Sequence, residues 1–399
     1  MKQLDPEISR LLTHMVTLNA SDLYLTAGSP PVYRKDGVGL AAKSPFSAEN
    51  VDAIAASLMT AEQREEFGHK LEMNLAFATP EGRFRVNVYR QRGATGLVVR
   101  LVRSQIRTLD ELGHPEALKS VVLSKRGLVL VVGGTGSGKS TTLAAMLDYR
   151  NTSETGHIVT VEDPIEYLHA HKRCVVSQRE VGVNTLSYSE ALKNTLRQAP
   201  DLVLIGEIRD LETMEAALGF AETGHLCLST LHANNANLAL ERVLSFFPSQ
   251  RHPEISTQLS LNLRAIISQR LVPSKSGGRA AALEILLDTP RIKALIKRGE
   301  TELIKDAMEQ SVIDGCQTFD TALLALCKAG HISEEAALQG SDSPNNLRLL
   351  LERLGGGKVH SGETPLRLVT SPEAQVRRQT MVLQAQKGPP GAAPAKGPR

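Results

Sequence analysis

One stretch of the chain has the residue types and the spacing that bind phosphate. Residues 133–140 read Gly-Gly-Thr-Gly-Ser-Gly-Lys-Ser, which fits the pattern G-x-x-x-x-G-K-[ST] at every fixed position. The stretch follows an apolar segment and opens a predicted helix. Glycines let successive N–H groups turn toward phosphate oxygens, and the positive end of the new helix adds to the attraction. We therefore expect ATP and Mg²⁺ here, with Lys139 bridging the β- and γ-phosphates and Ser140 holding the metal. The residues predicted to bind nucleotide are Gly133, Gly134, Thr135, Gly136, Ser137, Gly138, Lys139, Ser140, Thr141 and His225.

Carboxylates follow two further apolar segments. Glu162, Asp163 and Glu166 come after residues 157–161, and Glu207 comes after residues 202–205. The carboxyl ends of parallel strands meet at one edge of a sheet, so these acids should lie beside the phosphate loop. Glu207 can order the Mg²⁺ shell or its waters. One of the other carboxylates can polarise the attacking water, which needs a base within hydrogen-bond reach.

Two histidines bracket another apolar segment, residues 226–231. They are His225 and His232, and one of them is a candidate sensor of the γ-phosphate at the end of the strand. Taken singly, acids at strand ends are often only solvated, and an isolated histidine is more often structural than catalytic. Their order after a phosphate loop favours the catalytic interpretation.

The elements that must position these residues fall into two regions. Residues 1–103 contain alternating segments and turn signals typical of a small α+β domain with an antiparallel sheet, and Ser47 and Thr60 are predicted N-caps. From residue 117 strands alternate with helices, which predicts a parallel sheet covered on both faces. The predicted strands are 127–132, 157–161, 202–205 and 226–230, and the chain after about residue 250 is predicted to be mostly helical.

These patterns divide the chain into four segments. We predict an N-terminal domain at 1–103, a linker at 104–115, an ATPase domain with a helical C-terminal part at 116–354, and a disordered tail at 355–399. The tail begins with three glycines and is rich in Gln, Ala, Pro, Gly and Lys. Such a composition buries too little apolar surface to offset chain entropy.

The composition of the chain argues against several classes of protein. Basic and acidic residues number 46 and 43, a net charge of +3, which argues against a dedicated nucleic-acid binder. Apolar runs are too short to span a bilayer, and the first residues have no signal-peptide core. The four cysteines include no C-x-x-C pair, so neither a disulfide framework nor a zinc site is expected. These features predict a soluble cytoplasmic protein.

The motifs resemble the secretion and pilus ATPase family in their order and spacing. The likeness covers roughly residues 1–330, and three runs are similar to its PilT/PilU retraction branch: 21–26 (Ser-Asp-Leu-Tyr-Leu-Thr), 82–87 (Gly-Arg-Phe-Arg-Val-Asn) and 221–225 (Ala-Glu-Thr-Gly-His). The resemblance implies an α/β fold: a RecA-like P-loop ATPase domain with a smaller N-terminal α+β domain of PAS-like type. It also implies a hexameric ring.

The resemblance also implies residue roles. Glu162 would be the water-activating base, Glu207 the acidic residue at a strand end, and His225 and His232 the two positions of the family's His box. Arg85 and Arg100 would reach the nucleotide from the N-terminal domain, because guanidinium groups stabilise the charge that develops on the γ-phosphate. Further arginine candidates are Arg209 and Arg242.

One run separates the accessory from the principal form of this branch. Principal retraction ATPases have a helical Ala-Ile-Arg-Asn-Leu-Ile-Arg-Glu motif. The matching residues 291–298 keep its spacing but have Arg291, Ala294 and Arg298 in place of Ala, Asn and Glu. The resemblance therefore implies a motor that drives or assists type IV pilus retraction, the basis of twitching motility, together with a PilT-like paralogue. Its other implied partners are further copies of the chain and a platform protein of the PilC type, at the inner-membrane base of the pilus.

Three alternatives remain open. An assembly or type II secretion ATPase usually has a longer N-terminal region and a four-cysteine zinc motif, and the chain has neither. A nucleotide-gated structural subunit would bind ATP with little turnover. Lys139, Glu162 and Glu207 are all present, but their presence does not establish turnover. A DNA translocase is disfavoured by the near-neutral charge.

Overall fold

The N-terminal part of the chain forms an antiparallel sheet of six strands in the order β3-β2-β1-β6-β5-β4. The computed structural model describes residues 4–35, 38–102 and 105–354. The predicted tail at 355–399 falls entirely outside this range. The strands are β1 (Asp22–Thr26), β2 (Val32–Lys35), β3 (Val38–Ala41), β4 (Glu72–Thr79), β5 (Gly82–Gln91) and β6 (Ala94–Val102).

Three helices pack against this sheet: α1 (Pro6–Thr17), α2 (Ala48–Leu58) and α3 (Ala61–Lys70). Helix α1 buries Ile8, Leu11, Leu12 and Met15, whose spacing puts them on one face. Both predicted N-caps are confirmed, because the hydroxyl groups of Ser47 and Thr60 each accept the backbone N–H three residues on. The α+β character predicted for this part is therefore present.

A second sheet has seven strands in the order β13-β12-β7-β11-β10-β8-β9. Strands β7, β11, β10, β8 and β9 run parallel, β12 is parallel to β7, and β13 is antiparallel to β12. The strands are β7 (Gly127–Val132), β8 (Gly156–Glu162), β9 (Cys174–Glu180), β10 (Leu202–Ile205), β11 (Leu226–Leu231), β12 (Leu263–Pro273) and β13 (Arg279–Leu287).

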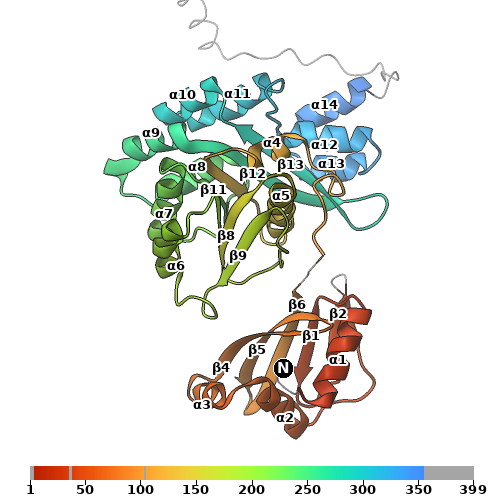
Figure 1. Cartoon of the computed structure of the whole chain (residues 1–399). Coiled ribbons are helices and arrows are strands. Elements are labelled where there is room, and N and C mark those ends of the chain that lie inside the picture. Colours follow the sequence, from red (N-terminus) through yellow and green to blue (C-terminus); the bar gives the residue numbers. More distant parts are fainter. Residues whose placement is uncertain (1–3, 36–37, 103–104, 355–399) are drawn as a thin grey trace, which may run out of the picture. The chain divides into compact units, whose positions relative to one another are not determined.

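Helices cover both faces of this sheet (Figure 1). Helices α4 (Ala117–Val122) and α5 (Lys139–Ser153) pack on the face to which Val129 and Val131 point. The opposite face, with Leu128, Leu130 and Val132, is covered by α6 (Tyr188–Thr195), α7 (Leu211–Glu222), α8 (Ala236–Ser245), α9 (His252–Asn262), α10 (Pro290–Arg298) and α11 (Ile304–Gln310). The predicted arrangement of a mostly parallel sheet between helices is thus present.

The chain after residue 250 is mostly helical as predicted, but the β12–β13 hairpin interrupts it, which the sequence pattern did not indicate. Residues 265–268 and 282–286 are all buried, so burial does not alternate along either strand, and all but Ser268 and Glu284 are apolar. A continuous apolar run does not by itself distinguish a buried strand from a helix. The pairing of β12 with β7 joins segments far apart in the sequence, which a local pattern does not reveal.

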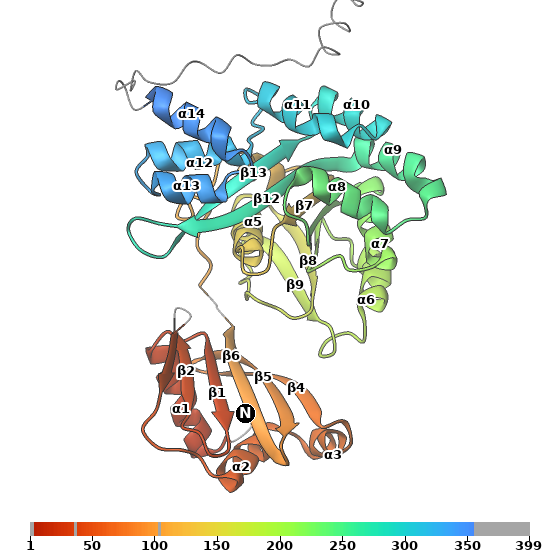
Figure 2. The same ribbon diagram turned by 180° about the vertical axis from the view of Figure 1, so that it is seen from behind.

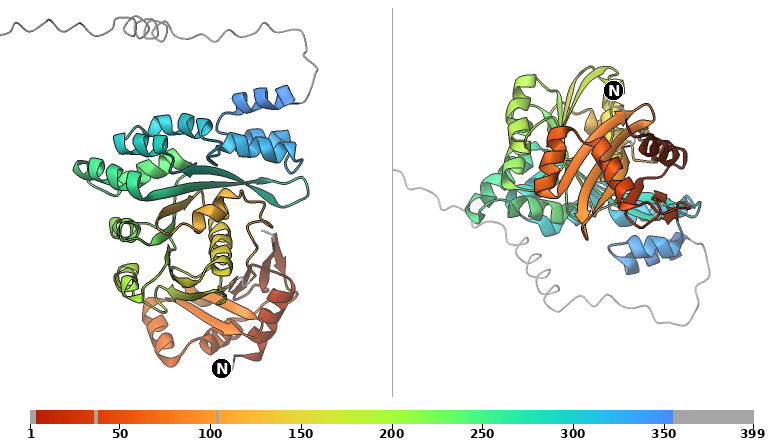
Figure 3. Two further views of the ribbon diagram at one scale, coloured as in Figure 1. Left: turned by 45° about the horizontal axis from the view of Figure 1, so that its top comes forward. Right: turned by 90° about the horizontal axis from the view of Figure 1, so that it is seen from below.

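The last described helices lie along this hairpin (Figure 2), and Figure 3 shows them in blue beside it. They are α12 (Phe319–Lys328), α13 (Glu334–Gly340) and α14 (Pro344–Leu354). The Arg270 guanidinium of β12 lies 3.8 Å from the centre of the Phe319 ring and 2.7 Å from an Asp342 oxygen. Within the described part of the chain, no helix is long and apolar enough to cross a membrane.

Candidate functional site

The phosphate loop leaves the carboxyl end of β7 and runs directly into α5. Gly136 and Gly138 have φ angles of +76° and +91°, which side chains other than glycine rarely adopt. Helix α5 begins at Lys139 with Gly138 as its N-cap, and no side chain caps its first N–H groups. Uncapped N–H groups and the positive end of the helix form an anion site.

Lys139 and its neighbours fit a nucleotide phosphate with Mg²⁺. The Lys139 ammonium donates to the carbonyl oxygens of Gly133 and Gly134 at 2.9 and 3.1 Å, so it lies over the loop. Burial lowers the pKa of Lys139, and the nearby Glu207 carboxylate opposes that shift. The Ser140 side chain is exposed in the first turn of α5, whereas the Thr141 hydroxyl is paired with the Tyr167 hydroxyl at 2.8 Å.

Glu207 is held by groups from two strand ends. One carboxylate oxygen lies 2.7 Å from His232 Nε2, at the end of β11, and the other accepts from Arg209 Nε at 2.6 Å. The Glu207 side chain is 17% exposed, so most of its surroundings are protein. Because the carboxylate also acts on the Lys139 ammonium, the predicted residues Lys139, Glu207 and His232 come together at one edge of the sheet.

Glu162 lies at the end of β8 and is buried. One of its oxygens accepts from the Thr160 hydroxyl at 2.6 Å and from Gln178 Nε2 at 3.3 Å. Burial raises the pKa of Glu162, while these two hydrogen bonds act in the opposite direction. A carboxylate with a raised pKa is a stronger base than an exposed one, which suits the proton transfer predicted for this residue.

The structure does not bring His225 to the phosphate loop. His225 immediately precedes β11, and in the β11–β7 pairing Leu226 lies opposite Gly127 while Leu231 lies opposite Val132. His225 is therefore at the far end of the strand from Gly133, about 20 Å away at 3.3 Å per residue. Its Nδ1 lies 3.1 Å from the Thr223 hydroxyl. The prediction that His225 binds nucleotide is wrong for a nucleotide held by the same chain's own loop.

The two predicted arginines lie on neighbouring strands of the first sheet. Arg85 and Arg100 are directly opposite each other in the β5–β6 pairing. The Arg85 Nη1 atom lies 4.0 Å from a Glu166 oxygen, and burial lowers its pKa. Arg100 donates to Asp22 at 2.8 Å, which raises its pKa. Arg85 therefore faces the acidic segment that follows β8, while Arg100 is held within its own sheet.

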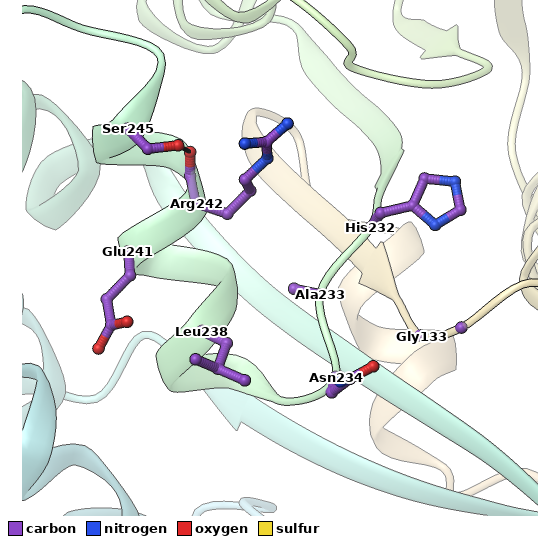
Figure 4. A pocket seen from close by; sticks show the side chains of 9 residues that line it. Gly133, His232, Ala233, Asn234, Leu238, Glu241, Arg242 and Ser245 are labelled. Carbon is purple, nitrogen blue, oxygen red and sulfur yellow. Dashed lines mark hydrogen bonds between the residues drawn. The ribbon is translucent and has the colours of Figure 1, made fainter.

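An open pocket of about 470 Å³ lies on one side of the phosphate loop (Figure 4). We call it the α8 pocket. Its lining comes from the loop, the segment after β11 and helix α8: Gly133, Gly134, His232, Ala233, Asn234, Leu238, Glu241, Arg242 and Ser245. Arg242 projects on the side of α8 that faces His232, whereas Glu241 projects the other way. The pocket offers an arginine and a histidine beside the phosphate loop.

Several polar neighbours were missed by sequence reasoning. Thr160 could have been found, because residues two apart on a strand share a face and Thr160 is two residues before Glu162. Gln178 could not, because it lies on β9, which the sequence pattern did not indicate as a strand. No sequence pattern indicated a role for Tyr167.

Comparison with known proteins identifies the family. The family model described as "Type II/IV secretion system protein" matches residues 2–317. The chain belongs to this family. Its sequence is 51% identical over 349 residues to the type IV pilus ATPase PilU of Pseudomonas aeruginosa, covering 87% of this chain and 91% of that protein. It is also 44% identical over 342 residues to the retraction ATPase PilT of the same organism, covering 85% of this chain and 99% of that protein.

A solved structure agrees with this assignment. The crystal structure of the pilus retraction motor PilT with bound ADP superposes with a TM-score of 0.80 at 39% identity, covering 86% of this chain and 99% of that one. The predicted fold class and the predicted resemblance to the secretion and pilus ATPase family are confirmed. The segment boundaries predicted from the sequence remain predictions.

The hydrogen bond from Thr160 leads to a test of Glu162. Thr160→Val removes a donor to the charged carboxylate, so the pKa of Glu162 should rise further. If Glu162 acts as a base, its charged form is needed, and turnover falls as pH drops through this pKa. We expect the acidic limb of the kcat/KM profile for ATP to move to higher pH in Thr160→Val. Thr195→Val is the control, because that buried hydroxyl donates only to the Ala191 carbonyl in α6. An unchanged limb in Thr160→Val would contradict the role.

Proposed function

We propose that this chain is a cytoplasmic ATPase that drives or assists retraction of type IV pili, as an accessory motor that works with a PilT-like paralogue. The observation that carries the proposal is a complete phosphate loop whose Lys139 lies beside Glu207, in a chain with 51% identity to PilU over 87% of its length. The reaction converts ATP and water into ADP and phosphate.

Each residue of the site has a separate role in ATP hydrolysis in this proposal. The loop N–H groups and Lys139 bind the phosphates, and Ser140 and Glu207 hold Mg²⁺, the latter through water. Bound Mg²⁺ would neutralise charge on the β- and γ-phosphates. Glu162 takes the proton of the attacking water, because burial raises its pKa and makes it a stronger base than an exposed carboxylate. His232, 2.7 Å from Glu207, links this carboxylate to the end of β11.

Arginines of the N-terminal sheet complete the site in this proposal. Arg85 is near Glu166, and Arg83 lies 3.1 Å from the buried Glu180 at the end of β9. Both acids lie on the segments that follow or flank the Glu162 strand. Closure of the arginines on the nucleotide, and its release after hydrolysis, would supply the motion of the motor.

Assembly and location follow from the same proposal. Successive closures around a ring of six copies would turn a membrane-embedded platform protein of the PilC type at the base of the pilus. The resemblance implies a glutamate at position 298 in principal retraction ATPases. In this chain the residue is Arg298, at the end of α10, and its Nε lies 2.8 Å from a Glu300 oxygen. This difference supports the accessory role.

The closure hypothesis predicts a loss of turnover without a loss of folding. Arg85→Ala and Arg100→Ala should each lower kcat, by roughly 1,000-fold or more for the arginine that contacts the γ-phosphate, because such arginines supply transition-state charge. Phosphate release at saturating ATP is the measurement. Arg34→Ala on β2, which is separated from β6 by β1 in the same sheet, is the matched control. Wild-type kcat in both Arg85→Ala and Arg100→Ala would exclude closure by these residues.

The cellular role is tested by retraction of labelled pili. In a strain that lacks the chain but has the PilT-like paralogue, the wild-type chain should restore retraction under load, and Lys139→Ala should not. In a strain that lacks the paralogue as well, the wild-type chain alone should restore little retraction. Restoration of pilus assembly rather than retraction would favour the assembly alternative, and full restoration by Lys139→Ala would favour a structural subunit.

A further inference from the structure

Three buried polar side chains form a hydrogen-bonded chain behind the phosphate loop. His114 lies in the stretch between β6 and α4, Thr142 in the first turn of α5, and Gln269 on β12. They are 8%, 0% and 3% exposed. The Thr142 hydroxyl donates to Gln269 Oε1 at 2.6 Å and lies 2.9 Å from His114 Nε2. We call these three residues the Gln269 network.

The direction of the hydrogen bonds follows from the number of protons available. Burial lowers the pKa of His114 to about 4, so the ring is neutral at physiological pH and has a single N–H. The one proton of the Thr142 hydroxyl is directed at Gln269. His114 Nε2 must therefore donate to Thr142, which leaves Nδ1 as an acceptor, and no group among the described residues donates to it.

This order fixes the orientation of the Gln269 carboxamide. With Oε1 engaged by Thr142, the NH₂ group points toward the end of the phosphate loop. A methyl group built on Gly138 would lie 2.7 Å from Gln269 Nε2. The backbone carbonyl oxygen of the same glutamine would lie 2.5 Å from a methyl group on Gly133. Gln269 thus contacts the first glycine of the loop and the glycine at which α5 begins.

We propose that Gln269 is a positioning residue that holds the phosphate loop in its nucleotide-binding conformation, and that Thr142 and His114 fix its orientation. Gln269 lies against both ends of the loop, with its carboxamide at Gly138 and its backbone carbonyl at Gly133. A loop that is held at both ends has fewer conformations to lose when phosphate binds. When only a fraction of the protein is competent to bind, the apparent Kd rises by the inverse of that fraction.

A purely structural role would have different consequences. A buried polar chain that only stabilises the fold would lower the unfolding midpoint when broken and leave the nucleotide affinity of the folded protein unchanged. A positioning role raises the Kd for nucleotide while the protein remains folded. The two roles are therefore separated by binding measured well below the unfolding transition.

The test is titration of the full chain with a fluorescent ADP analogue in the presence of Mg²⁺. Thr142→Val, close in shape, removes the hydroxyl that orients Gln269, and Gln269→Met removes the carboxamide at similar length. We expect the Kd of each variant for the ADP analogue to rise about tenfold, which corresponds to about one tenth of the protein having its loop in the binding conformation. Thr142→Ser should restore affinity. The KM for ATP should rise in parallel, while kcat at saturating ATP should change much less.

The controls separate this inference from the proposed function on which it rests. Thr195→Val removes a buried threonine hydroxyl in α6, away from the loop, and should leave the Kd unchanged. Wild-type affinity in folded Thr142→Val and Gln269→Met would overturn the positioning role alone. Failure of the wild-type chain to bind would overturn both proposals, and Lys139→Ala marks the level of binding without the phosphate site.

Discussion

The burial of β7 is the constraint on which the rest of the site depends. All six of its residues are buried, and the strand is paired with β11 on one side and β12 on the other. The loop that leaves it at Gly133 therefore starts from a fixed point. The register of the neighbours then brings Glu162, Glu207 and His232 to the same edge, because Glu162 ends β8 while Glu207 and His232 follow the ends of the parallel strands β10 and β11.

The charged side chains at this edge of the sheet lie next to side chains of opposite charge. Glu207 is shared by His232 and Arg209 and acts on Lys139. Arg209 also lies 3.7 Å from Asp163, so its guanidinium pairs with the acidic segment after β8 as well. A nucleotide phosphate would compete with these carboxylates for the same cations. Binding and release would then rearrange ion pairs that already exist, which suits a motor that must alternate between states.

Sequence reasoning found the parts of this site that are encoded locally. The bounds of β7 and β10 were predicted as observed, because each is a short apolar run closed by a turn signal or a carboxylate. The phosphate loop was found from its spacing. What was missed depends on pairing between distant segments: β12 lies beside β7 and brings Gln269 under the loop, and β9 brings Gln178 to Glu162. His225 was assigned to the nucleotide from its place in the family's His box, but it precedes the strand whose other end meets the phosphate loop.

The decisive measurement is phosphate release by the purified full chain, alone and in the presence of a PilT-like retraction ATPase. The account predicts Mg²⁺-dependent release that disappears in Lys139→Ala and falls strongly in Glu207→Gln, with the highest rate when the paralogue is present. Glu215→Gln on the exposed face of α7 serves as the carboxylate control. Release that is the same in wild type, Lys139→Ala and Glu207→Gln, or absent from the wild type under both conditions, would contradict ATP hydrolysis at this edge of the sheet.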